Sequence, residues 1–254
     1  MAAIFDTHFH IVDPRFPVMP NQGFLPPIFT VDDYLSRTAG LGITGGTVVA
    51  GSFQGTQTEY MVDALAKLGP TFVGVIQVPA TVTDEEILRL NAAGVRAVRF
   101  NLYRGGSAGI EDLDRLARRV HDVAGWHAEL YADASTLEPI METVANLPKI
   151  SIDHLGMTQA GLPNLLALVG RGAKVKATGF GRTEVDVPHA LREIARVNPS
   201  SLMFGTDLPS QRARRPFERA DIDLIRDTLG DALAQKAFRD NAVEFYRPRE
   251  IPNP

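Results

Sequence analysis

Short apolar runs alternate with longer amphipathic stretches eight times along the chain, and this alternation is what most constrains the fold. The runs are rich in β-branched residues, as in 73–78 and 95–102, which is typical of parallel strands buried on both faces. The expected strands are 3–8, 45–50, 72–78, 95–102, 127–133, 149–155, 173–179 and 201–207. The expected helices are 32–40, 57–68, 84–93, 111–124, 135–146, 159–170, 187–197, 219–229 and 231–246.

This order predicts an α/β fold, a (β/α)8 TIM barrel with a single closed parallel sheet. A doubly wound open sheet is the alternative, although such sheets usually have fewer strands. The chain of 254 residues shows no linker, low-complexity tract or clear repeat, so one domain over 1–254 is expected.

Composition narrows the classes of partner and of chemistry. The chain contains no cysteine, so any metal ligands would have to be histidines and carboxylates. A net charge of −4 argues against a nucleic-acid partner, and no apolar run approaches the length of a membrane span. With no basic and apolar leader at the start, a cytoplasmic protein without a membrane partner is expected. A homo-oligomer stays open.

Residues with catalytic chemistry follow three of the expected strands. His8 and His10 end the first run, His154 ends the sixth, and Asp207 follows the eighth. Because the carboxyl ends of barrel strands meet at one rim, these four side chains are expected to converge. Imidazoles can donate protons, accept them or bind a metal. Asp207 can accept a proton from an attacking water or ligate a metal that activates it.

Alternation along the first run predicts which way its side chains point. Asp6, His8 and His10 share one parity and are expected to face the barrel interior. Phe5 and Phe9 have the opposite parity and are expected to meet the helices.

Two later runs carry charged side chains whose orientation in the barrel has to be predicted. Lys176 is expected inside the barrel, paired with Glu129 or Asp6, because an unpaired buried ammonium is costly. Asp153 is expected to point away from His154, and to have either a structural role or a role in supporting the residues of the site.

Arginines on the expected active face indicate an anionic ligand. Arg99 and Asn101 share interior parity on one run, and Arg182 follows another. A guanidinium in a dry barrel needs an anion, either a protein carboxylate or one from the substrate. Three more arginines follow the last run: Arg212, Arg214 and Arg215. Together they favour a small, carboxylated substrate.

The Pro-rich segment 14–27 directly follows the first expected strand. It is too long for a tight turn between a strand and a helix. It is therefore expected either to cover the active face or to be an extended surface loop.

Five motifs, taken together and in this order, resemble the amidohydrolase-related branch of the amidohydrolase superfamily, which contains lactonases of pyrone dicarboxylates and of sugar acids. The motifs are Asp6-Thr7-His8-Phe9-His10, Gly94 to Asn101, Ile152-Asp153-His154-Leu155-Gly156, Lys176-Ala177-Thr178-Gly179 and Gly205-Thr206-Asp207-Leu208-Pro209. The resemblance implies a (β/α)8 barrel in which Asp207 activates water for attack on a carbonyl.

Many members of the superfamily bind one or two divalent metals through the His pair, the last-strand Asp and a Lys or His on the fourth or fifth strand. Here Tyr131 ends the fifth run, and Arg99 and Asn101 end the fourth. This departure resembles the metal-independent lactonases, so no cofactor is favoured.

The resemblance implies hydrolysis of a lactone, with Asp207 as general base. His8, His10 and His154 would then orient the water or the carbonyl. The substrate would be bound by Arg99, Tyr131, Arg182 and Asn101.

Three alternatives stay open. The first is a zinc-dependent hydrolase of the same fold, with His8, His10, Asp207 and His154 as candidate ligands. The second is a non-oxidative decarboxylase of an unsaturated or aromatic acid. The third is a barrel without activity that only binds a ligand.

Overall fold

Eight parallel strands form one nearly closed barrel in the computed structural model, which describes residues 3–251. The strands pair in sequence order, as the alternation predicted. They are β1 (Ile4–Phe9), β2 (Ile43–Val49), β3 (Phe72–Ile76), β4 (Val95–Asn101), β5 (His127–Tyr131), β6 (Ile150–Ile152), β7 (Lys174–Ala177) and β8 (Leu202–Phe204). The predicted (β/α)8 barrel is confirmed.

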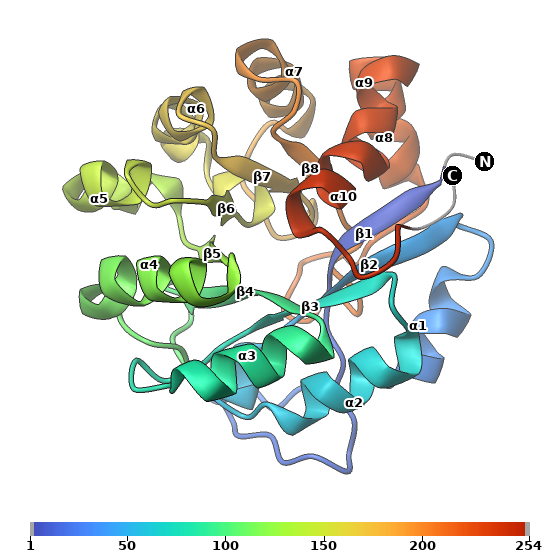
Figure 1. Ribbon diagram of the computed structural model, residues 1–254. Coiled ribbons are helices and arrows are strands. Elements are labelled where there is room, and N and C mark those ends of the chain that lie inside the picture. Colours follow the sequence, from blue (N-terminus) through green and yellow to red (C-terminus); the bar gives the residue numbers. More distant parts are fainter. Residues whose placement is uncertain (1–2, 252–254) are drawn as a thin grey trace.

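Helices surround the sheet on its outer side, except that α10 lies across one end of the barrel (Figure 1). They are α1 (Val31–Thr38), α2 (Glu59–Leu68), α3 (Asp84–Ala93), α4 (Leu113–Ala124), α5 (Met141–Ala145), α6 (Leu162–Gly170), α7 (Val187–Val197), α8 (Ala220–Leu229), α9 (Asp231–Gln235) and α10 (Asn241–Tyr246). Within 3–251, each of these helices is too short or too polar to cross a membrane.

Two predicted helices are less regular than expected. Ala134–Ile140 is a 3₁₀ helix that precedes α5, and it contains Pro139. Proline lacks the amide proton of a regular helical hydrogen bond, so Pro139 interrupts the α-helical pattern here. The last predicted helix continues through a π turn, Lys236–Asp240, between α9 and α10.

The apolar core has an outer and an inner part. The outer part lies between the sheet and the helices, and the inner part fills the amino-terminal end of the barrel. The inner part consists of Phe5, Val49, Val73, Val75, Ala97 and Met203 with Ala242, Phe245 and Tyr246 of α10. The Tyr246 ring stacks on Phe5, with centroids 5.9 Å apart. Because α10 plugs this end, polar side chains can gather at the carboxyl-terminal end.

The predicted orientation of Phe5 and Asp6 was wrong. Phe5 faces inward, whereas the Asp6 carboxylate accepts a hydrogen bond from Tyr34 of α1. The register against β2 shifts between Asp6 and Phe9. Residues before the shift therefore do not face the side that alternation counted back from His8 and His10 predicts. Phe9 does meet the helices, because its ring stacks on Tyr34 with centroids 3.7 Å apart.

Candidate active site

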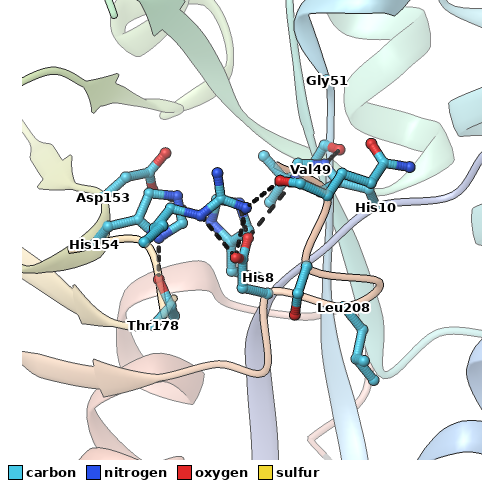
Figure 2. A network of polar contacts seen from close by, with 12 residues as sticks. His8, His10, Val49, Gly51, Asp153, His154, Thr178 and Leu208 are labelled. Atoms are coloured by element: carbon cyan, nitrogen blue, oxygen red, sulfur yellow. Dashed lines mark hydrogen bonds and ion pairs between the residues drawn. The ribbon is translucent and has the colours of Figure 1, made fainter. Parts of the chain in front are cut away.

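The four residues expected to converge do meet at the carboxyl-terminal end of the barrel. His8 lies between the two other imidazoles, with ring centroids 5.0 Å from His10 and 4.7 Å from His154 (Figure 2). Asp207 Oδ1 lies 3.8 Å from His8 Nε2 and 3.9 Å from His10 Nε2. All four side chains are buried, so their electrostatic interactions are weakly screened.

Asp6 ties the first strand to the turn after the last one. Its carboxylate accepts hydrogen bonds from Thr206 N at 2.8 Å, Thr206 Oγ1 at 2.7 Å and Tyr34 Oη at 3.0 Å. A fourth comes from His8 N at 3.2 Å. The next residue is held as well, because Asp207 N donates to the backbone oxygen of His8 at 2.7 Å. Asp6 therefore fixes His8 and Asp207 relative to one another.

Asp207 presents its two oxygens to different partners. Oδ2 accepts from Arg182 Nε at 2.8 Å and from Nη2 at 2.6 Å. Oδ1 faces the imidazoles and accepts no hydrogen bond within the described part of the chain. Burial raises the pKa of Asp207 to about 6, and the adjacent Arg182 limits that rise. A carboxylate with such a pKa is anionic at neutral pH and can still accept a proton.

His10 is held in one tautomer by the neighbouring strand. Its Nδ1 lies 2.8 Å from the carbonyl oxygen of Val49, which can only accept, so Nδ1 carries the proton. Nε2 therefore points its lone pair toward Asp207. Burial, together with the charge of Arg99, lowers the pKa of His10 to about 3, which keeps the ring neutral.

His154 enters the site through its backbone conformation. Its φ of +51° breaks the alternation that β6 would otherwise continue. Nδ1 lies 2.8 Å from Thr178 Oγ1, and the ring meets Tyr131 edge-on at 5.1 Å. Gly179 makes this placement possible, since a Cβ there would lie 2.7 Å from Nδ1.

The expectation that Asp153 points away was wrong. Ser151 on β6 is in register with the interior Glu129 of β5, so regular alternation brings Asp153 inward too, and His154 is the residue that departs from it. Asp153 Oδ2 accepts from Arg99 Nη2 at 2.6 Å, and Oδ1 lies 3.4 Å from His8 Nδ1. Burial alone would raise the pKa of Asp153, but the charges of Lys176 and its other neighbours hold it well below its usual range.

Lys176 forms the floor of the site and is fully buried. It pairs closely with Glu129, one of the two predicted partners, and not with Asp6. Its Nζ also lies 3.3 Å from His8 Nδ1 and 3.5 Å from Asp153 Oδ1. Burial raises the pKa of Glu129 to about 7, against the opposing charge of Lys176.

An open pocket lies above these groups, with about 390 Å³ of empty space including its solvent-filled mouth. Predicted site residues line it: His10, Arg99, Asn101, Tyr131, His154 and Arg182. Further lining residues were missed because they lie in loops that carry no periodic signal: Phe24, Ser52, Phe53, Arg104 and Gln211.

The arginines of this face differ in their partners. Arg99 is paired with Asp153, and Arg182 with Asp207, so these two charges are matched within the protein. Arg104 and Arg212 also line the pocket, and within residues 3–251 neither has a carboxylate at ion-pair distance. Two predicted arginines lie away from the pocket in ion pairs of their own: Arg214 with Glu184 and Arg215 with Asp221.

The Pro-rich segment 14–27 reaches across the pocket mouth. The Asn21 side chain donates to the backbone oxygen of Arg104 at 3.1 Å. Arg212 donates to the backbone of Asn21 and lies over the Phe24 ring at 4.4 Å. The expected covering role therefore agrees with the position of this segment.

The donor atoms of His8, His10 and Asp207 lie within 4.8 Å of one another, a spacing that one divalent ion could bridge. His10 Nε2 offers a lone pair, and Asp207 Oδ1 is otherwise without a hydrogen bond in the described structure. His8, Asp153 and His154 form a second group of the same kind. By the spacing of their donor atoms, both groups are therefore candidate metal sites.

Comparison with known proteins places this geometry in a family. The chain is 25% identical to a 2-pyrone-4,6-dicarboxylate hydrolase of Comamonas testosteroni, over 98% of this chain and 92% of that protein. It is 29% identical to a 4-sulfomuconolactone hydrolase of Rhizobium radiobacter, over 95% and 89%. A crystal structure from Agrobacterium tumefaciens shares the fold with a TM-score of 0.86 at 22% identity, over 97% and 96% of the two chains. The amidohydrolase family profile matches residues 5–247, and the chain belongs to the amidohydrolase family.

Proposed function

We propose that the protein hydrolyses a lactone of a carboxylated small molecule, with Asp207 as general base. The observation that carries this proposal is Asp207 Oδ1, which is buried, accepts no hydrogen bond from the described residues and faces two imidazole nitrogens at 3.8 and 3.9 Å. The relatives named as hydrolases of a pyrone dicarboxylate and a muconolactone support the substrate class.

The reaction needs one proton acceptor that later returns the proton. Asp207 takes a proton from water as the water oxygen bonds to the lactone carbonyl carbon. The carbonyl oxygen becomes an oxyanion, stabilised by N–H groups of His8 or His154 and of Arg99, because His10 turns a lone pair toward the site. The intermediate then collapses by breaking the ring C–O bond, and Asp207 returns its proton to the leaving oxygen. The new carboxylic acid then releases its proton to solvent, so the product carries one more carboxylate than the substrate.

A carboxylate on the substrate is favoured by the rim of the pocket. Arg104 and Arg212 are the lining arginines without a carboxylate partner in the described structure, so a substrate anion can pair with them. Tyr131 and Asn101 line the pocket between this rim and the imidazoles. They would position the ring of the substrate.

His8, His10 and Asp207 are the residues that would hold a divalent ion such as zinc. When bound, such an ion would lower the pKa of a water molecule attached to it. The proposal favours a reaction without it, because Arg182 already neutralises Asp207 and Arg99 places a second cation beside His10.

The test is a screen of carboxylated and neutral lactones in weak buffer with a pH indicator, with and without a chelator. We expect acid release from a carboxylated lactone, unchanged by the chelator. Asp207→Asn should abolish turnover while leaving the unfolding temperature near that of the parent. Retained turnover in this variant would remove Asp207 from the mechanism, and release of carbon dioxide in place of ring opening would assign a decarboxylase.

A further inference from the structure

Lys176 lies directly beneath the imidazole of His8. Its Nζ contacts the Glu129 carboxylate and lies 3.3 Å from His8 Nδ1 in hydrogen-bond geometry. An ammonium group carries three N–H donors and no acceptor. In the contact with His8, Lys176 therefore donates and the ring nitrogen accepts.

We infer that Lys176 fixes His8 in the tautomer that carries its proton on Nε2, and that Lys176 is thereby a positioning residue for hydrolysis. A neutral imidazole has one N–H, so a ring that accepts at Nδ1 must donate at Nε2. Nε2 is the atom that faces Asp207, at 3.8 Å from its Oδ1. This inference rests on the proposed function for its catalytic consequence, but not for the tautomer itself.

Asp153 is the competitor that would select the opposite tautomer. Its Oδ1 lies 3.4 Å from His8 Nδ1 and would accept a proton from that nitrogen. This contact does not reach hydrogen-bond geometry within the described structure, whereas the contact from Lys176 does. The other oxygen of Asp153 is already bound by Arg99 at 2.6 Å.

The two neighbouring histidines then have opposite proton arrangements. His10 donates from Nδ1 to Val49 and presents a lone pair at Nε2, whereas His8 presents an N–H. His10 Nε2 and Asp207 Oδ1 are two acceptors 3.9 Å apart, so one water molecule can donate a hydrogen bond to each of them. The His8 N–H is the donor to the oxygen of the carbonyl group whose carbon this water attacks. Each ring thus has a separate task.

The same arrangement acts against a metal at His8. A metal ligand must offer a lone pair. Lys176 keeps the His8 proton on Nε2, which is the nitrogen that faces the other candidate ligands, His10 and Asp207. His8 could bind an ion at Nε2 only by turning its proton to Nδ1, toward the ammonium group.

The direct test is a long-range ¹H–¹⁵N NMR spectrum of the full chain labelled with ¹⁵N-histidine. The chain has six histidines, and the His8 signals are assigned by their loss in His8→Gln. We expect a protonated Nε2 and an unprotonated Nδ1 for His8, with the reverse pattern for His10. A protonated Nδ1 on His8 in the unmodified protein would overturn the inference.

Lys176→Met removes the donor and keeps the length of the side chain. We expect His8 to move its proton to Nδ1 and kcat to fall about 100-fold, as for loss of one oxyanion donor, with KM changed by less than about 3-fold. Lys174→Met is the matched control, because this neighbour on β7 donates to the backbone of Ser200, outside the site. It should leave the His8 spectrum and kcat unchanged.

Removing Lys176 takes the close partner from buried Glu129 and leaves Arg99, at 3.6 Å, as its ion-pair partner in the described structure, so the variant could fail to fold. Lys176→Met combined with Glu129→Gln removes both charges and should give the same tautomer change in a folded protein. A His8 spectrum that is unchanged in whichever variant folds would contradict the inference. If the tautomer is as inferred but no lactone is opened, the proposed function fails while the role of Lys176 in setting the tautomer stands.

Discussion

At the scale of single residues, the site depends on burial more than on unusual side chains. Asp207, His10 and Glu129 have ordinary chemistry, but each has a pKa moved by the loss of water around it. Fixed partners then limit or direct these shifts, as Arg182 does for Asp207. The proton arrangement that hydrolysis requires is therefore set by neighbours on other strands.

The pH dependence follows from Asp207. Only the anionic carboxylate can accept a proton from water, and burial raises its pKa to about 6. We expect kcat/KM to be constant above this pH and to fall about tenfold for each unit below it. Initial rates between pH 4.5 and 8.5, corrected for any unfolding, measure the midpoint. A midpoint near the ordinary value for Asp would contradict the assignment.

Arg182 should control the position of that midpoint. Its guanidinium lowers the pKa of Asp207, so Arg182→Met should shift the acid limb to higher pH. Part of the lost rate should then return at alkaline pH, because more Asp207 becomes anionic. Arg214→Met is the control, since Arg214 pairs with Glu184 outside the pocket. An acid limb that stays in place in Arg182→Met would show that Asp207 does not produce it.

At the scale of elements, the junction of β1 and β8 is the critical one. The sheet closes there through few ladder contacts, and the Asp6 carboxylate supplies the additional hydrogen bonds. The same junction carries His8, His10 and Asp207. Stability and alignment of the site are thus linked through one side chain.

Asp6→Asn should therefore destabilise the protein strongly. An amide turns an N–H₂ group toward buried donors, which leaves at least one of them unsatisfied and costs about 3 kcal/mol. For a chain of this size we expect the unfolding temperature to fall by about 6–12 °C in a thermal scan.

Two further variants serve as references for the loss of stability in Asp6→Asn. Tyr34→Phe removes a single donor to Asp6 and should cost about 1 kcal/mol. Asp32→Asn, on the exposed face of α1, should change the stability by less than about 0.5 kcal/mol. Equal unfolding temperatures for Asp6→Asn and Asp32→Asn would contradict the role of Asp6.

At the scale of the whole molecule, the pocket is assembled from loops that are far apart in the sequence. The segment 14–27, the loop with Arg104 and the loop with Arg212 meet through Asn21 at the mouth. The barrel holds the reacting groups, and these loops would select the substrate. This division predicts that rim substitutions change binding more than catalysis.

Arg104→Met and Arg212→Met should each raise KM for a carboxylated lactone by about 10-fold, because a charge-assisted hydrogen bond is lost. Neither variant should change KM for a neutral lactone, and kcat should change less than KM. Steady-state kinetics with the two substrates separates these effects. Equal losses on both lactones would mean that the arginines maintain the loop and do not contact the carboxylate.

Sequence patterns predicted the barrel and the convergence of His8, His10, His154 and Asp207, because strand ends in a parallel barrel share one rim. The pattern placed Phe5, Asp6 and Asp153 wrongly. Alternation of side chains does not hold across a register shift such as the one in β1. The positive φ of His154, which breaks the alternation after β6, cannot be recognised from the sequence. Arg104 and Phe24 were missed because loop geometry has no period.

The sequence by itself determined which chemistry this protein has available: imidazoles and a carboxylate at strand ends, in a chain whose alternating runs close into a barrel. Only the tertiary structure decided how these groups are charged and protonated. Those properties depend on burial and on partners such as Arg182, Val49 and Lys176, which lie on other strands or their loops. Electrostatic interactions act through space and fall with distance, so they are set by the folded arrangement and not by the order of residues.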